Sequence, residues 1–316
     1  MIRKQKVDMG KSNKKMAARM GKQIWKHRDY YIMLLPAVLY VLIFCYTPMY
    51  GLQIAFKDYR VSLGFSGSRW VGLQHFRDFF NGYSFWPLLK NTLLISVYSL
   101  AVGFPIPVIV ALIINELKGK YKKVVQTVLY APHFISTVVL VGMITIMFSV
   151  SAGAVNTVLS ELGFEKIYFM GSPKYFRHLY VWSGVWQQMG WSAIIYISAL
   201  AGVDPGLHEA ASIDGASRMQ RVIHINIPSI LPTIIIMLIL QIGSLLTVGY
   251  EKTYLLQTDL NISVSEIIST YVYKRGIVNS NYSFSTAVGL FNNVINVTLL
   301  ILANKVSSKF TETSLF

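Results

Sequence analysis

The chain has few of the residues that form catalytic sites, metal sites and disulfide bonds. It has one cysteine, six histidines and only 14% charged residues. The single cysteine, Cys45, cannot form a disulfide within the chain. The histidines are scattered, without the spacing of a metal site and without a recognisable nucleophile–base pair. We therefore expect no catalytic residue, no bound metal and no cofactor held by this chain.

Acidic residues are almost absent from the long apolar segments, and Glu116 and Glu251 stand only at segment ends. A self-sufficient secondary transporter or channel typically carries paired carboxylates near the middle of the membrane, or inverted repeats. Neither feature is visible, so this class is the alternative interpretation and not the preferred one.

A nucleotide-binding loop is also missing. The run Gly10-Lys11-Ser12 matches only the end of such a loop, because position 5 is Gln and no strand precedes it. If the protein works with ATP, its ATPase is a separate chain. The net charge of +15 does not indicate nucleic-acid binding, because the basic residues flank apolar segments instead of forming one face.

What the chain has in abundance is hydrophobic residues, at 53% of 316. They predict an all-α polytopic membrane protein with six transmembrane helices, since each segment has the roughly 20 apolar residues needed to cross a bilayer. We expect a basic cytoplasmic tail (1–28), a six-helix transmembrane domain (29–303) and a short cytoplasmic C-terminus (304–316). The six expected spans are 31–56, 88–116, 124–150, 179–203, 230–250 and 284–303.

The distribution of lysine and arginine predicts the orientation. Residues 1–28 contain ten basic residues, and the short loop 117–123 contains four. Because basic loops favour the cytoplasmic side, both termini are expected in the cytoplasm. Long aromatic-rich connections (57–87, 151–178 and 251–283) would then lie outside.

The stretch 204–228 reads as an ordered helix-turn-helix between two spans. Asp204 and Pro205 suit a helix start, and Asp214-Gly215 suits its end. Ser217 and Gln220 have capping-box spacing, so a second helix should follow at once. Pro228 ends that helix or begins the next span.

The same stretch resembles the EAA loop of binding-protein-dependent ABC importer permeases. Glu209-Ala210-Ala211, then Gly215, Ile225 and Pro228 stand at the spacing of that motif. Ile227 departs from it, since the family usually has Leu there. The Asp214-Gly215-Ala216 form is similar to the carbohydrate permeases, and four further segments resemble the LplB-type polysaccharide permeases: 132–136, 265–273, 282–292 and 312–316.

The resemblance implies a MetI-like type I ABC importer permease fold in a bacterial cytoplasmic membrane. It also implies that 204–228 is a coupling helix seated on the ATPase. The implied partners are a second, homologous permease subunit, an ABC ATPase dimer that binds ATP and Mg²⁺, an extracytoplasmic solute-binding protein, an oligosaccharide and membrane lipid. The implied coupling residues are Glu209, Ala210, Ala211, Asp214, Gly215, Ala216 and Arg218.

A sugar path should combine aromatic faces with amide side chains. The residues predicted for such a path are Trp186, Gln187, Trp191, Gln241, Asn292 and Asn296. The tryptophans could equally be interfacial or packing residues, and the asparagines could be interhelical hydrogen-bonding residues. His133 is expected to bond a carbonyl freed by Pro132. Uronic-acid oligosaccharides of the pectin or alginate type and neutral oligosaccharides both remain open as substrates.

Overall fold

The computed structural model describes residues 25–311 and 314–315, and the chain divides into two compact units, residues 1–53 and 54–316. Apart from 25–28, the predicted basic tail lies outside the described residues. The described part of the first unit is a helical rod, made of α2 (Arg28–Tyr40), the π-helical turn η1 (Val41–Tyr46) and the start of the 3₁₀ segment η2 (Thr47–Phe56). This rod, Arg28–Phe56, is long and apolar enough to cross a membrane, as predicted for the first span.

The second unit is helical apart from one small hairpin in the connection after the first span. Strands β1 (Lys57–Asp58) and β2 (Arg69–Trp70) pair antiparallel, with Lys57 opposite Trp70. The helices up to the middle of the chain are α3 (Gly64–Gly67), α4 (Gln74–Asn81), α5 (Phe85–Gly103), α6 (Pro105–Glu116), α7 (Gly119–Tyr130), η3 (Ala131–Phe134), α8 (Thr137–Met147), α9 (Ala154–Glu161) and α10 (Pro173–Leu200). Those that follow are α11 (Pro205–Ile213), α12 (Arg218–Arg221), η4 (Val222–Asn226), α13 (Ile227–Gly243), α14 (Tyr250–Leu256), α15 (Ile262–Ser265), α16 (Ile268–Tyr273), η5 (Lys274–Val278) and α17 (Tyr282–Thr311).

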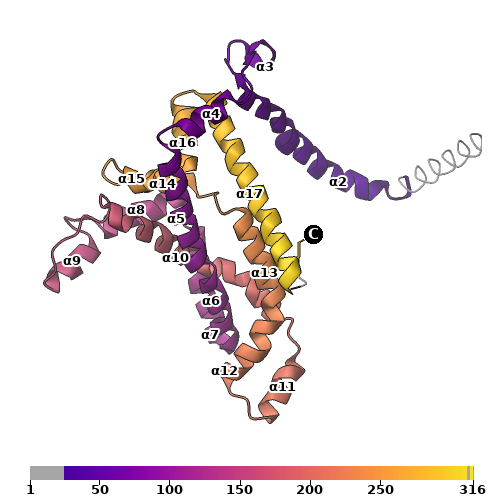
Figure 1. Ribbon diagram of the computed structural model, residues 1–316. Helices are drawn as coiled ribbons and strands as arrows, with labels where there is room; N and C mark the ends of the chain where they lie inside the picture. The colour runs from indigo at the N-terminus through magenta and orange to yellow at the C-terminus, as the bar shows by residue number, and fades with distance from the viewer. Residues whose placement is uncertain (1–24, 312–313, 316) are drawn as a thin grey trace, which may run out of the picture. The chain divides into compact units, whose positions relative to one another are not determined.

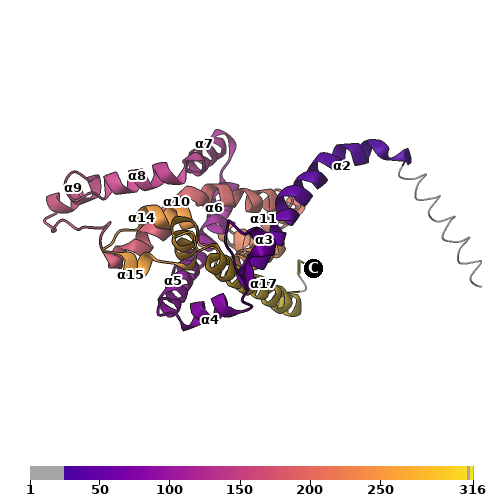
Figure 2. The ribbon, with the colours of Figure 1, turned by 90° about the horizontal axis from the view of Figure 1, so that it is seen from above.

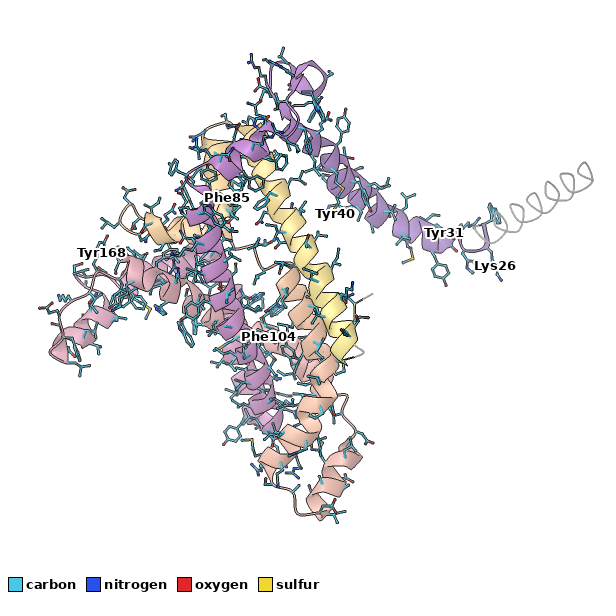
Figure 3. The ribbon with its side chains drawn as sticks, in the orientation of Figure 1. Lys26, Tyr31, Tyr40, Phe85, Phe104 and Tyr168 are labelled. Carbon is cyan, nitrogen blue, oxygen red and sulfur yellow. The ribbon has the colours of Figure 1, made fainter. Side chains whose placement is uncertain are left out.

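Helix α5 with α6, helix α13 and helix α17 run as long rods along the second unit (Figure 1). The first is continuous enough to count as one 32-residue span, Phe85–Glu116, because Pro105 sits at the first turn of α6, where no backbone donor is needed. Figure 3 places Phe85 at one end of α5 and Phe104 at its junction with α6. Helices α4 and α16 lie at one end of these rods, and α11 and α12 lie at the other (Figure 1).

The third predicted span is not one straight helix. It is broken between α7–η3 and α8, which meet at 97°. Pro132 lies in η3 just before the break, Ile135 is extended, and the Ser136 side chain caps α8 by accepting from the Val139 N–H at 3.3 Å. Seen from above, α7, α8 and α9 follow one another along one side of the unit (Figure 2). The expectation of a continuous helix over 124–150 was therefore wrong, because the proline and a serine cap divide it.

The fourth predicted span corresponds to α10, which has 28 residues and is long enough to cross. It is not among the four described helices that are also apolar enough, or the five counted with the bent pair. Its middle carries Ser183, Gln187 and Gln188, which lower its hydropathy. A polar helix of this length inside a membrane protein faces neighbouring helices or a cavity.

The fifth and sixth spans differ from prediction at their ends. The helix of the fifth span begins at Arg218 and stops at Gly243, and the next six residues are not helical. Gly243 lies against α17, since an added Cβ would stand 2.6 Å from Leu300 Cδ1. The sixth span, α17, continues beyond the predicted residue 303 to Thr311.

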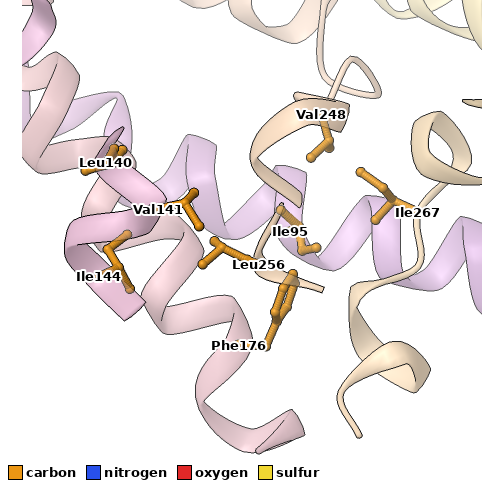
Figure 4. Packing of buried hydrophobic residues seen from close by; sticks show 8 residues of the cluster. All are labelled: Ile95, Leu140, Val141, Ile144, Phe176, Val248, Leu256 and Ile267. Atoms are coloured by element: carbon orange, nitrogen blue, oxygen red, sulfur yellow. The ribbon is translucent and has the colours of Figure 1, made fainter. Parts of the chain in front are cut away.

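A buried apolar cluster holds α5, α8, α10 and α14 together (Figure 4). Leu256 of α14 and Val248 of the preceding linker point into it, opposite Val141 of α8. This packing fixes the position of α14 against the long helices. The buried members of the cluster are Ile95, Leu140, Val141, Ile144, Phe176, Val248, Leu256 and Ile267.

Candidate functional site

The loop 204–228 forms the two helices that its sequence predicts. The Asp204 side chain caps α11 by accepting from the Gly206 N–H at 2.9 Å, with Pro205 in the first turn. Gly215 ends the helix with a φ of +80°, in the left-handed region that favours glycine. The N–H of Ala216 donates to the Ala211 carbonyl at 2.9 Å, which completes a Schellman motif.

The second half of the loop is continuous with the fifth span. Ser217 and Gln220 form the predicted capping box, in which the Ser217 N–H donates to Gln220 Oε1 at 2.7 Å. From Arg218 the helix runs through Pro228 to Gly243 without ending, since the proline falls in the first turn of α13. The Arg221 guanidinium donates to Ser212 Oγ and so ties this rod to α11.

The predicted coupling residues are at the surface of this loop. Glu209, Ala210, Asp214, Gly215 and Arg218 are exposed, whereas Ala211 and Ala216 are half-buried. Among the described residues, no ion pair involves Glu209, Asp214 or Arg218. Apolar side chains lie on the same two helices, and Ile213 is 86% exposed. Apolar side chains rimmed by charges are typical of a surface that binds another protein.

A cavity of about 480 Å³ opens between α5, α6, α10, α13 and the linker before α14. Of the predicted path residues, Gln187 and Gln241 line it, while Trp186 lines a separate, largely apolar cavity between α8 and α10. Trp191, Asn292 and Asn296 line neither. The lining contains no Asp or Glu, and its polar residues are Ser96, Ser99, Gln187, Gln188, Ser192, Gln241, Ser244, Thr247 and Lys252.

Two neighbouring glutamines of α10 hold the broken third segment in place. The Gln187 Nε2 donates to the Ile135 carbonyl at 2.7 Å, and Gln188 Oε1 lies 2.9 Å from His133 Nδ1. The His133 ring also stacks on Trp191, with ring centroids 4.2 Å apart. His133 thus bonds a glutamine side chain and not the carbonyl freed by Pro132, as had been predicted, and Gln187 satisfies the Ile135 carbonyl at the break.

The two predicted asparagines connect α17 to the non-helical linker after α13. Asn296 Oδ1 accepts from the Leu246 N–H at 3.0 Å, and its Nδ2 donates to Thr247 Oγ1 at 2.9 Å. Asn292 Nδ2 donates to the Leu246 carbonyl at 3.4 Å. These bonds replace the helical bonds that the linker lacks.

Sequence reasoning missed Lys252, the one charged residue of the cavity lining. It lies in α14, in the connection between the fifth and sixth spans, and its Nζ donates to the Tyr180 carbonyl at 2.8 Å. Its ammonium also stands 4.8 Å from the centre of the Tyr180 ring. Burial lowers the pKa of Lys252 to about 7. A lysine just after an apolar segment looks like an ordinary interfacial residue, so the sequence carries no signal for this position.

The described residues contain no group of three or more His, Cys, Asp or Glu that could hold a metal. The polar groups of the cavity are hydroxyls, amides and one ammonium, and they lie among apolar side chains such as Leu100 and Val185. Those groups suit the recognition of a hydroxyl-rich, uncharged or anionic ligand.

Comparison with known proteins assigns this architecture to a transport family. Residues 103–311 match the family described as binding-protein-dependent transport system inner membrane component. Protein LplB of Bacillus subtilis (strain 168) is 45% identical over 287 residues, with 90% of each chain covered. The polygalacturonan/rhamnogalacturonan transport system permease protein YteP of the same organism is 44% identical over 287 residues, covering 90% of this chain and 89% of that protein.

A solved structure matches the whole fold. It is the crystal structure of a bacterial alginate ABC transporter in complex with an alginate pentasaccharide-bound periplasmic protein. One of its chains is 39% identical, with a TM-score of 0.85 and coverage of 93% of this chain and 99% of that one.

Proposed function

The chain belongs to the family of binding-protein-dependent transport system inner membrane components and is a permease subunit of a sugar-importing ABC transporter, and we propose that the complex takes up oligosaccharides released from acidic polysaccharides. In this proposal the chain is the non-catalytic membrane subunit. A separate ATPase dimer binds ATP and Mg²⁺, a second permease subunit completes the path, and an extracytoplasmic binding protein delivers the sugar.

The observation that carries the coupling part of the proposal is the continuity of the loop with α13. The EAA residues lie on α11, and α11 is tied to the 26-residue helix Arg218–Gly243 by the bond from Arg221 to Ser212. The ATPase would seat on α11 and α12, with small residues such as Ala210 allowing close approach. Nucleotide-driven closure of the ATPase would then move α13 as a rigid body.

The cavity between α5, α6, α10 and α13 supports a sugar path at the end of α13 that lies away from the loop 204–228. Because Gln241 lies on α13 and lines the cavity, movement of α13 would change the cavity shape. Gln187, on the facing α10, would contribute the second amide. This linkage gives alternating access a physical route from the loop to the sugar.

The acidic character of the substrate is supported by two relatives. One relative is named for polygalacturonan and rhamnogalacturonan transport, and the alginate transporter has a chain of the same fold at 39% identity. Both names refer to polymers with carboxylated sugars. The outer connection also carries basic residues, among them Lys57 and Arg60, which suit an anionic ligand or lipid head groups.

The test is purification of the tagged chain from its native membrane in mild detergent, with mass spectrometry of everything that is bound. We expect an ABC ATPase, a second permease and a binding protein, and reconstitution of the complex should give ATP-dependent uptake of oligogalacturonate or oligoalginate. Recovery of a lone chain whose uptake is abolished by an ionophore and unaffected by ATP depletion would instead support the secondary-transporter alternative.

A further inference from the structure

Lys252 is a cation placed in a cavity without a counterion. The ion pairs among the described residues join Arg28 to Asp29, Arg60 to Asp58 and Lys274 to Glu266, and none includes Lys252. Its described partners are the carbonyl and the ring of Tyr180, which are dipolar or quadrupolar and carry no net charge. No Asp or Glu lines the cavity.

An ammonium in this position is costly unless an anion approaches it. Partly buried charges in proteins are normally paired, because removal from water costs more free energy than dipoles alone return. The position of Lys252 is nevertheless well fixed. Its neighbour Thr253 is fully buried and donates to the Gly249 carbonyl at 3.0 Å, and Leu256 is anchored in the core cluster.

The space beside the ammonium is kept open by a glycine of α10. A Cβ added at Gly184 would stand 3.1 Å from Lys252 Nζ. The remaining polar groups of the cavity are hydroxyls and amides, which suit the hydroxyl groups of a sugar. Ser96 also lines the cavity, and its buried hydroxyl has no hydrogen-bond partner among the described residues.

We propose that Lys252 binds the carboxylate of a uronic-acid residue as the oligosaccharide crosses the cavity, and that it thereby selects acidic over neutral sugars in the permease itself. The inference rests on the proposed function and adds a specificity-determining residue to it. Selection by this permease residue acts in addition to whatever selection the binding protein makes.

The experiment compares two probes, tetragalacturonate and its fully methyl-esterified form, in which an uncharged methyl ester replaces each carboxylate. Uptake is measured with the complete complex in proteoliposomes, and each variant is expressed as a ratio to wild type for each probe. Discrimination by the binding protein cancels in this ratio because the same binding protein is used throughout. We expect Lys252→Gln to lower uptake of the acid by about tenfold or more, the size of a lost charged hydrogen bond, and to leave uptake of the ester within about twofold.

Three further variants separate charge from structure. Lys252→Arg keeps the charge and should retain most uptake of the acid. Gly184→Ala should displace the flexible lysine end and lower uptake of the acid selectively, although it alters no charge. Lys166→Gln removes an exposed lysine that lines neither cavity and should behave as wild type.

The outcomes are distinct. Equal losses for acid and ester in Lys252→Gln, or no loss for either, would overturn the carboxylate role while leaving the importer proposal intact. Failure of the wild-type complex to transport either probe would overturn the proposed substrate class. Thermal stabilisation of wild type, but not of Lys252→Gln, by an anionic phospholipid, with no effect of the sugar, would assign the ammonium to a lipid phosphate.

Discussion

Lysines of similar sequence context have different surroundings in the fold. Lys274 pairs with Glu266 at 3.2 Å, whereas Lys252 meets only Tyr180. Both follow apolar stretches, but Lys252 stands directly after Glu251 and Lys274 directly before Arg275, so the lysine with an acidic neighbour in sequence is the one that forms no ion pair among the described residues. Lys274 meets Glu266 across the short helix α16, eight positions away, whereas Lys252 meets Tyr180 of α10, 72 positions away, and this second contact arises only when the helices pack.

The lowered pKa of Lys252 predicts a pH dependence for uptake of the acidic probe. Burial lowers the pKa to about 7, so the side chain is mostly charged below that pH and progressively loses its proton above it. At substrate concentrations well below saturation, the ratio of acid to ester uptake should fall as pH rises from about 6 to about 8, because rates in this regime report the free protein. Initial rates in buffered proteoliposomes measure this ratio.

Other titratable groups near α14 require a control. The helices packed against it carry Tyr180 and His178 on α10 and Tyr271 and Tyr273 on α16, and α14 itself carries Tyr250, Glu251 and Tyr254. The variant Lys252→Arg keeps all of these groups, and its arginine stays positively charged throughout this pH range. The acid-to-ester ratio of Lys252→Arg should therefore be flat. An equal slope in both proteins would assign the pH dependence to another group.

At the scale of elements, the turn at Gly215 joins two rigid helices. Its φ of +80° is strained for a β-branched side chain, with a cost of roughly 1–2 kcal/mol. Gly215→Val should therefore leave membrane insertion unchanged, because the loop is at the surface, but should abolish uptake and lower recovery of the ATPase on purification. Uptake assays and co-purification measure both effects.

The matched variant is Gly215→Asn, since asparagine adopts the left-handed conformation more readily than other residues. It should retain substantial uptake. If Gly215→Val transports normally, the turn has no role in coupling. If both variants fail equally, the surface at this position matters and not its backbone conformation.

A second glycine sets the distance between α10 and α7. A Cβ added at Gly190 would stand 2.1 Å from the Leu129 carbonyl oxygen, and backbone cannot move aside as a side chain can. Gly190→Ala should destabilise the fold by about 1–3 kcal/mol or more, as overpacking does. Thermal denaturation of the purified complex in detergent should show a lowered apparent Tm.

Gly142 offers the control in the neighbouring helix α8, because an added Cβ would meet nothing within 4 Å. Gly142→Ala should be neutral or slightly stabilising, since alanine favours a helix. A similar loss of stability in both variants would mean that helix α10 does not approach α7 as closely as described.

For the whole molecule, the orientation in the membrane is a prediction from charge that can be tested directly. The one native cysteine, Cys45, is removed as Cys45→Ser, which leaves no other thiol. In that background, Lys120→Cys should be shielded from a membrane-impermeant maleimide added to intact cells, and Asp259→Cys should react. Both positions are exposed in the structure.

The reverse pattern of labelling would place the termini outside and overturn the assignment of 204–228 to the cytoplasm. Permeabilised cells serve as the positive control, since both positions should then react. Labelling is followed by gel shift of the tagged chain.

The residues of 204–228 were informative because their structure is local. A cap, a left-handed glycine and a capping box depend on neighbours within a few residues, so Asp204, Gly215 and Ser217 occupy the predicted conformations. The apolar segments were informative for the same reason, since hydropathy needs only length and composition. The coupling roles of Glu209 and its neighbours remain predictions, because they concern a second chain.

The cavity and the broken third segment depend on contacts between residues far apart in the sequence. Gln187 meets Ile135 across 52 positions and Lys252 meets Tyr180 across 72. Trp186, Gln187 and Trp191 all lie on α10, but their surroundings differ. Trp186 lines the largely apolar cavity, Gln187 lines the cavity that contains Lys252, and Trp191 stacks on His133. The sequence alone determined the transporter family, the first, second, fifth and sixth apolar segments and the local structure of the loop. Only the packing of helices decided which polar groups face the cavity, because a residue's direction is set by the rotation of its helix against its neighbours.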